Sequence, residues 1–207
     1  MRKALVALVT AGLVPLLASV GTAATPQTVT ISTSRPSVVF GKSVTLSGKV
    51  STGKAGENVS VLAEPSGTTA FVALAPPVQT VSGGHWSDVV KPTIETSYQA
   101  KWKSATSSTV SVKVRPLITL TLVSQATGRF STKVSAARSF AGKFVLVQRL
   151  TSTGVSTLKR VTLDANSTAS FRVRLHLGRS RLRVVMPTSQ TAPGYITGTS
   201  NVVTVSH

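Results

Sequence analysis

Few side chains in this sequence could carry acid–base or nucleophilic chemistry. The 207 residues include five carboxylates and three histidines, and they include no cysteine. General acid–base catalysis by carboxylates needs two of them close together in a cleft. Four of the five fall on separate predicted strands and loops in the first half of the chain: Glu57, Glu64, Asp88 and Glu95. The sequence therefore predicts a protein that is not an enzyme, with no catalytic residues and no cofactor.

The most compact polar group is His85-Trp86-Ser87-Asp88. Ser, His and Asp this close in sequence rarely converge, because neighbouring residues on a strand point to opposite faces. We interpret the segment as part of a hairpin, in which Gly83-Gly84 supplies the bend and Trp86 packs inward.

Metal binding is not indicated either. Calcium sites need several clustered oxygen ligands. The nearest approach to such a cluster is Asp164-Ala165-Asn166, which is more simply a turn between two strands. Isolated histidines without cysteine provide no zinc-ligand spacing. We expect no metal site.

The residues that stand out are arginines near the C-terminus. The segment from Phe171 to Val184 reads FRVRLHLGRSRLRV, and strand alternation places its apolar residues on one face and its basic residues on the other. If the two strands form a hairpin, the basic side chains share one face. If their connection crosses between two sheets, the basic side chains decorate both outer faces. The candidate polyanion-binding residues are Arg172, Arg174, His176, Arg179, Arg181 and Arg183.

The charge distribution favours the same region. Residues 25–115 contain nine Lys and Arg against four acids, and residues 116–207 contain twelve against Asp164 alone, within a formal net charge of +18. Such an excess of positive charge attracts anions, although the same arginines could be solvated residues of a basic protein. The expected partner is an anionic cell-wall polymer or an acidic polysaccharide. Nucleic acid is disfavoured, because few aromatic side chains are free to stack on bases.

The N-terminus predicts secretion. Arg2 and Lys3 precede an apolar run from Ala4 to Val20, and small residues follow up to Ala24. This order matches a cleavable signal peptide over residues 1–24. The apolar run falls short of the roughly 20 residues that a membrane-spanning helix needs, and it contains a proline. We expect a secreted, extracellular chain that can associate with the cell wall and whose mature part has no transmembrane anchor.

The mature chain contains an internal repeat. VTLSGKVSTGKAG at 44–56 and FSTKVSAARSFAG at 130–142 lie 86 residues apart, and Trp86 falls near Phe171 at almost the same offset. The second copy has a longer final loop at 187–198. The repeat predicts two domains, 25–115 and 116–207, that meet at Arg115-Pro116.

Each copy divides into about seven short strands separated by turn residues. Val44, Leu46 and Val50 alternate with polar residues, as expected for a half-buried strand. In the second copy the predicted strands include 143–150, 157–163, 170–177 and 181–186, and no mature segment has a sustained helical period. Seven strands in about 90 residues predict an all-β chain with two tandem immunoglobulin-like β-sandwich domains after the signal peptide.

Several segments of the mature chain match a known pattern. They are SVTLSGKV, TSYQAKW and SSTVSVKVRP in the first copy, and SFAGKFVLVQRL, RLRVVMP and PGYITGTSN in the second. Through these segments the chain resembles secreted actinobacterial proteins built from tandem bacterial immunoglobulin-like domains. The resemblance covers essentially the whole mature chain. It implies a spacer, a surface module or an accessory binding unit, and it brings no catalytic residue.

The expected function is a non-catalytic structural or adhesive module that its basic surface holds at the cell envelope. The alternative is a binding module for an anionic polysaccharide or another polyanion, which would use the basic strands of the second copy. In both cases we expect a monomer.

Overall fold

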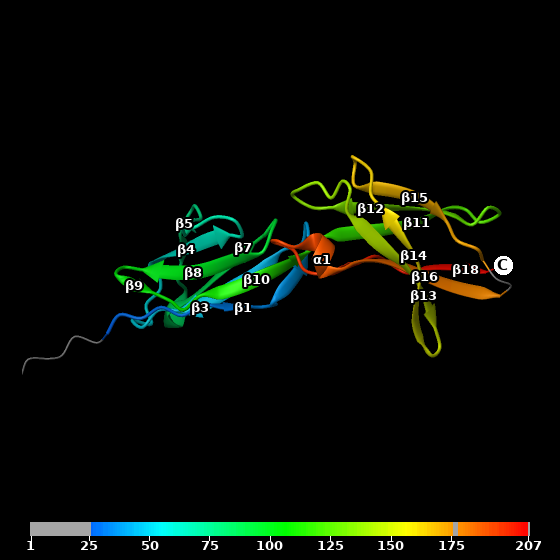
Figure 1. The fold of residues 1–207 in the computed structure, drawn as a ribbon. Helices are drawn as coiled ribbons and strands as arrows, with labels where there is room; N and C mark the ends of the chain where they lie inside the picture. The colour runs from blue at the N-terminus through cyan, green and yellow to red at the C-terminus, as the bar shows by residue number, and fades with distance from the viewer. Residues whose placement is uncertain (1–25, 176–177, 207) are drawn as a thin grey trace, which may run out of the picture.

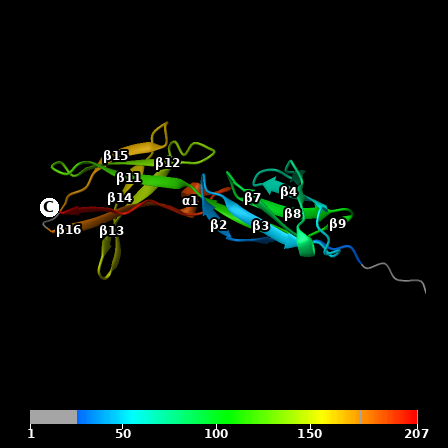
Figure 2. The same cartoon turned by 180° about the vertical axis from the view of Figure 1, so that it is seen from behind.

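The computed structural model describes residues 26–175 and 178–206. Over these residues the chain forms two pairs of β-sheets placed end to end along an elongated molecule (Figure 1). We call strands β1–β10 the first sandwich and strands β11–β18 the second sandwich. Figure 2 shows the same arrangement from behind, with the short helix α1 (Thr188–Thr191) between the two sandwiches. The predicted signal peptide, 1–24, lies outside the described residues.

The first sandwich has an immunoglobulin-like strand order. One sheet follows the order β1-β3-β7, and the other follows β2-β10-β8-β4-β5, with β6 added to β4 and β9 added to β8. Strand β2 runs parallel to β10. The strands are β1 (Ser32–Thr33), β2 (Ser37–Val39), β3 (Val44–Lys49), β4 (Asn58–Pro65), β5 (Val72–Ala73), β6 (Val78–Gln79), β7 (His85–Val90), β8 (Thr96–Trp102), β9 (Ala105–Thr106) and β10 (Val110–Arg115).

The second sandwich repeats this plan. One sheet follows the order β11-β12-β15, and the other follows β14-β13-β16-β17, with β18 also paired to β16. The all-β, immunoglobulin-like sandwich fold is therefore confirmed. The strands are β11 (Leu117–Ser124), β12 (Arg129–Ser135), β13 (Phe144–Thr151), β14 (Gly154–Thr162), β15 (Thr168–Arg172), β16 (Arg179–Met186), β17 (Gly198–Thr199) and β18 (Val203–Ser206).

Alternating apolar residues of the facing sheets form the core. In β3 the side chains of Val44 and Leu46 are buried, and in β13 those of Val145 and Val147 are buried. Burying one such side chain stabilises the fold by about 1.5–3 kcal/mol. The largest side chains that are almost fully buried are Trp102, Tyr195, Phe130, Phe140, Leu46, Leu182 and Met186.

The pairing register corrects one detail of the predicted repeat. Val44 pairs with Val90, and Phe130, the counterpart of Val44 86 residues later, pairs with Phe171. The counterpart of Phe171 is therefore Val90 rather than Trp86. Trp86 and Phe171 are both bulky and apolar and lie at nearly the repeat offset, which suggested the match. In the second sandwich, however, β15 is shifted along β12 relative to the way β7 pairs with β3.

Strand β15 also ends earlier than the predicted strand over 170–177. Its neighbour in the sheet, β12, begins at Arg129, and Arg129 pairs with Arg172, the last residue of β15. Beyond that pair the ladder has no further partner strand. Arg174 therefore lies on the connection that follows β15 and not on the strand itself.

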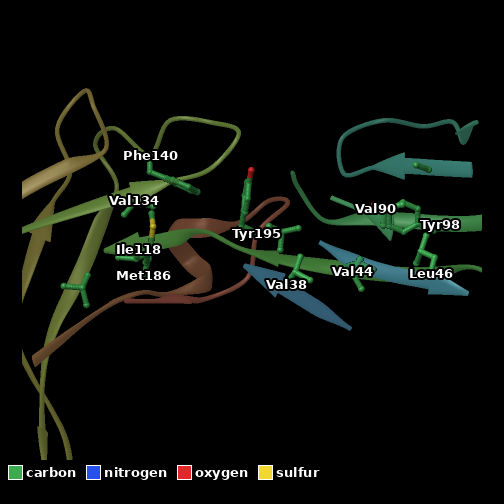
Figure 3. Packing of buried hydrophobic residues seen from close by; sticks show 14 of the residues in the cluster. Val38, Val44, Leu46, Val90, Tyr98, Ile118, Val134, Phe140, Met186 and Tyr195 are labelled. Carbon is green, nitrogen blue, oxygen red and sulfur yellow. The ribbon is translucent and has the colours of Figure 1, made fainter. Parts of the chain in front are cut away.

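The final loop of the second sandwich, 187–198, packs against the first sandwich. The Tyr195 hydroxyl donates to the Thr93 carbonyl oxygen (2.7 Å) and accepts from the Ala137 amide (3.0 Å). The Glu95 amide donates to the Gly194 carbonyl oxygen (2.9 Å). Figure 3 shows the Tyr195 ring between the buried side chains of the two sandwiches. One buried tyrosine therefore bridges both.

The direct connection between the sandwiches is short. Strand β10 ends at Arg115 and β11 begins at Leu117, so that Pro116 alone separates them. The Ile196 amide donates to the Val114 carbonyl oxygen (3.0 Å), next to this connection. The predicted division into independent domains at Arg115-Pro116 stays a prediction, and it falls where one set of sheets ends and the other begins.

Candidate anion-binding site

The two arginine-bearing strands lie in different sheets. Strand β15 belongs to the sheet β11-β12-β15, and β16 belongs to the sheet β14-β13-β16-β17. Of the two arrangements considered from the sequence, the connection that crosses between sheets is the one present. The basic side chains therefore do not form a single face.

On β16 the basic residues point outward. Leu182 and Val184 are fully buried, whereas Arg181 is exposed and Arg183 is half-buried. The Nε of Arg183 donates to the Oε1 of Gln148 (2.9 Å), its cross-strand neighbour on β13. These arginines are spread along one strand and do not converge on a common point.

Arg172 and Arg174 instead contribute to a pocket at the end of the second sandwich that lies away from the first. Strand β15 runs toward this end, where the C-terminal strand β18 also finishes (Figure 1). The pocket has a volume of about 330 Å³, and we call it the basic pocket. It is lined by Arg149, Leu158, Lys159, Arg172, Val173 and Arg174.

Arg149 enters the basic pocket from the core face of β13. It pairs with the fully buried Leu182, and residues paired across antiparallel strands point to the same side of the sheet. Its Nη2 donates to the Arg174 carbonyl oxygen (3.0 Å). Its Nε is buried and has no hydrogen-bond partner among the described residues. A cation thus occupies a core-facing position with part of its hydrogen-bonding capacity unused.

Lys159 enters from the neighbouring strand in the same way. It pairs with Val147, which is fully buried, and its Nζ lies 3.5 Å from the Arg172 carbonyl oxygen. Arg149 and Lys159 therefore both reach between the two sheets and contact backbone carbonyls of the segment 172–174. These contacts hold two cations against the backbone of the segment that carries Arg172 and Arg174.

A further like-charge contact lies beside the basic pocket. Arg129 of β12 and Arg172 of β15 are directly paired across the sheet, and both are exposed. Like charges directly opposite each other in a sheet are destabilising. The fold gains nothing from this pair alone, whereas an anion placed between the two side chains would offset their repulsion.

Asp164, the single carboxylate among residues 116–207, does not neutralise these cations. Its Oδ1 accepts from the amides of Asn166 and Thr168, and its Oδ2 accepts from the Thr168 hydroxyl (2.6 Å). The hydrogen bond from the Thr168 side chain, followed by those from the backbone, holds the pKa of Asp164 below its usual value. Asp164 lies near the start of β15, and the strand separates it from Arg172 by about 13 Å at 3.3 Å per residue.

The structure thus divides the predicted site. It brings Arg172 and Arg174 together, and it leaves Arg179, Arg181 and Arg183 on β16, in the other sheet. His176 lies outside the described residues. Sequence reasoning missed Arg149, Lys159 and Arg129. A signal for Arg149 was present, because it continues the core-facing alternation of Val145 and Val147 with a cation.

The polar segment of the first sandwich behaves as a strand. Residues 85–88 begin β7, with Trp86 buried and its two neighbours exposed. The inward packing of Trp86 is confirmed; His85 and Ser87 share the outer face of the strand, whereas Asp88 lies on the same side as Trp86. Within the described part of the chain, no three His, Cys, Asp or Glu residues form a group suited to a metal ion. No helix there is long and apolar enough to cross a membrane.

Comparison with known proteins yields likeness of fold. No family model and no curated protein matches the sequence. A solved tetra-tandem repeat from the extending region of a large adhesion protein is 12% identical with a TM-score of 0.38; the match covers 87% of this chain and 49% of that one. This chain thus spans about half the length of that structure.

Two further solved structures are similar over most of the chain. Bovine butyrophilin is 12% identical with a TM-score of 0.38, over 88% of this chain and 99% of that one. The D0–D1 domain of intimin is 16% identical with a TM-score of 0.30, over 86% of this chain and 97% of that one. These values carry no argument about what the chain binds.

Proposed function

We propose that this chain is a non-catalytic extracellular module that associates with an anionic polymer of the cell envelope through its second sandwich. The first sandwich acts as a spacer. The observation that carries the proposal is the set of exposed arginines on both sheets of the second sandwich, beside a single carboxylate that is already hydrogen-bonded within a turn. The predicted signal peptide supports the extracellular location.

The charge of the second sandwich makes a polymeric anion a suitable partner. Twelve Lys and Arg stand against one acid in residues 116–207, and a field of this sign concentrates anions at the surface. A polymer with many charges gains from each neutralised contact, because every contact releases condensed counterions. Charges on two faces and at one end can engage neighbouring segments of the same polymer.

The aromatic residues of the second sandwich argue against a nucleic acid. Phe130, Phe140, Phe171 and Tyr195 are all buried, and the Arg160 guanidinium lies 3.4 Å from the centroid of the Phe144 ring. Non-specific binding of single-stranded nucleic acid relies on exposed aromatic rings on which bases stack. An acidic polysaccharide or a wall polymer with phosphate groups needs no such platform.

A salt series on purified cell-wall material tests the proposal. The test variant replaces four exposed arginines with Gln: Arg172, Arg174, Arg179 and Arg181. We expect retention to fall about tenfold or more and its salt dependence to flatten, because each lost contact also removes counterion release. The fold should persist, since exposed substitutions usually change stability by less than about 0.5 kcal/mol each.

The matched control removes four exposed lysines of the first sandwich: Lys42, Lys49, Lys101 and Lys113. Lys103 is left in place because it pairs with Glu57 (3.4 Å). Retention of the control should resemble that of the parent. Equal losses in both variants would mean that binding follows net charge alone. A test variant that binds as well as the parent would leave the second sandwich as a plain spacer.

A further inference from the structure

We propose that the basic pocket is a discrete site for one phosphate group, through which the end of the second sandwich that lies away from the first holds a phosphate-bearing polymer. This inference rests on the proposed function and assigns the contact to a location that the overall charge does not define. It also adds Arg149 and Lys159 to the binding residues.

The composition of the basic pocket suits a phosphate. Four cationic residues line it, two of which (Arg149 and Lys159) extend their side chains toward the segment 172–174, and no carboxylate lines it. Guanidinium groups pair bidentately with phosphate oxygens, and a phosphate monoester on the polymer offers three such oxygens and up to two negative charges. A carboxylate offers two oxygens and one charge, so it matches a pocket with several cations and no acid less well.

The size and the remaining lining residues fit a phosphate attached to a small carbon skeleton. A volume of about 330 Å³ lies at the lower end of the range for small-molecule sites. Leu158 and Val173 provide an apolar portion of the wall. The phosphate would lie among the cations, and the carbon atoms of a sugar or polyol would contact the two apolar side chains.

The position of Arg149 is hard to explain by folding alone. The counterpart of Arg149 in the first sandwich, 86 residues earlier, is Ala63, which is buried in the core. A buried Nε without a hydrogen-bond partner costs free energy that an alanine would not cost. A residue that opposes local stability in this way is expected where binding uses it.

The backbone beneath the basic pocket is held in place before any anion arrives. The Val173 amide donates to the Gly128 carbonyl oxygen (2.9 Å). Gly128 has φ +58°, and a Cβ there would overlap the Val173 carbonyl oxygen, so only glycine allows this approach. Together with the bonds from Arg149 and Lys159 to carbonyl oxygens, this contact fixes the segment 172–174. A site organised in advance loses less free energy when it orders around a ligand.

The test is a titration of the isotope-labelled full chain with inorganic phosphate at constant ionic strength, followed by amide chemical shifts. We expect saturable shifts concentrated around residues 149, 159 and 172–174. Arg149→Ala should weaken the apparent affinity about tenfold or more, since a charge-assisted bidentate contact is lost. Lys143→Ala removes one positive charge from an exposed position of the second sandwich outside the proposed binding residues, and it should change the affinity less than about twofold.

Two controls separate a loss of phosphate binding from a loss of folding. Arg149→Ala gives the position the residue found at Ala63, so a cooperative melt close to that of the parent is expected. If the variant failed to fold, Arg174→Gln, which changes an exposed side chain, would carry the same comparison. Shifts that never saturate, or equal losses in the Arg149 and Lys143 variants, would overturn the inference and leave a diffuse basic surface.

Wall retention, measured on the same proteins, separates the two proposals. Glycerol phosphate at saturating concentration and constant ionic strength should release the parent from wall material, because it competes for the basic pocket. Failure of that competition, despite saturable phosphate binding, would show that the pocket serves free phosphate compounds and would overturn its role in holding the polymer. If the unmodified protein were not retained on wall material but still bound phosphate, the proposed function would be wrong and the phosphate site would still stand.

Discussion

After β7 of the first sandwich the chain reads Lys91-Pro92-Thr93, and at the equivalent place after Phe171 the second sandwich has Arg172-Val173-Arg174. The facing strand holds Ala63 in the first case and Arg149 in the second. In the first sandwich this end borders a pocket of about 500 Å³ whose lining includes Asp88 as well as Lys91. Charges there are balanced, whereas in the second sandwich they are all positive.

The difference follows from what each end must contact. At the first sandwich, Thr93 accepts a hydrogen bond from Tyr195, and a loop of the second sandwich packs against this end. At the second sandwich no other sandwich packs against the same end among the described residues. One scaffold thus uses equivalent loops for two purposes, a neutral joint and a basic pocket, by changing a few side chains. Substitutions at the joint and in the second sandwich test this difference between the two ends.

Tyr195→Ala should destabilise the joint most. The ring is buried and packs edge-on against Phe140, with centroids 5.7 Å apart. Truncating a buried aromatic side chain costs about 3–5 kcal/mol. Denaturant unfolding of the full chain should show this loss in the second sandwich. Tyr195→Phe keeps the ring and removes the hydroxyl bonds to Thr93 and Ala137, so it should cost only about 1–3 kcal/mol. Equal losses for both variants would mean that the hydroxyl, and not the packing, matters.

The isolated segment 116–207 lacks the first sandwich at the joint. We expect it to fold cooperatively with β-type circular dichroism, because both of its sheets are complete. It should be less stable than the same part of the full chain by about 1–3 kcal/mol, since Tyr195 and Gly194 lose their partners across the joint. An absence of any cooperative melt would show that the boundary at Arg115-Pro116 is wrong.

Acid should affect the second sandwich through Asp164, and this effect is the smallest. Because its pKa is lower in the folded state than in the unfolded state, Asp164 stabilises the fold above its unfolded pKa and loses this contribution as the pH falls through the folded pKa. Thermal melts from pH 7 down to pH 3 should therefore decline less steeply for Asp164→Asn than for the parent. Identical slopes would show that this carboxylate does not contribute to acid unfolding.

Much of the fold could be predicted from period-two alternation and turn residues. Strands such as β3 and β13 show this alternation, because one face of each strand is buried in the core and the other is partly exposed to solvent. The end of β15 could not be predicted, since it depends on where the partner strand β12 begins. The four-residue helix α1 is too short to have a recognisable period. The shifted register of Phe171 reflects pairing, which a linear offset does not contain.

The candidate site was predicted only in part for the same reason. A run of alternating arginines identifies exposed cations on a strand, and Arg172 and Arg174 were found that way. The two further cations, Arg149 of β13 and Lys159 of β14, precede Arg172 by 13 or more residues in sequence. Only the sandwich brings these strands together. A basic residue on the core-facing side of an otherwise apolar strand is the local pattern that could have indicated Arg149.

The parallel pairing of β2 with β10 has a mechanical consequence. Ser37, Val38 and Val39 lie beside Lys113, Val114 and Arg115, and the latter strand continues almost directly into β11. Tension along the molecule pulls β2 toward the N-terminal end and β10 toward the second sandwich. The hydrogen bonds between the two strands are then sheared together instead of being opened one after another. The first sandwich can therefore bear tension through several hydrogen bonds at once, so that its strands do not separate one bond at a time.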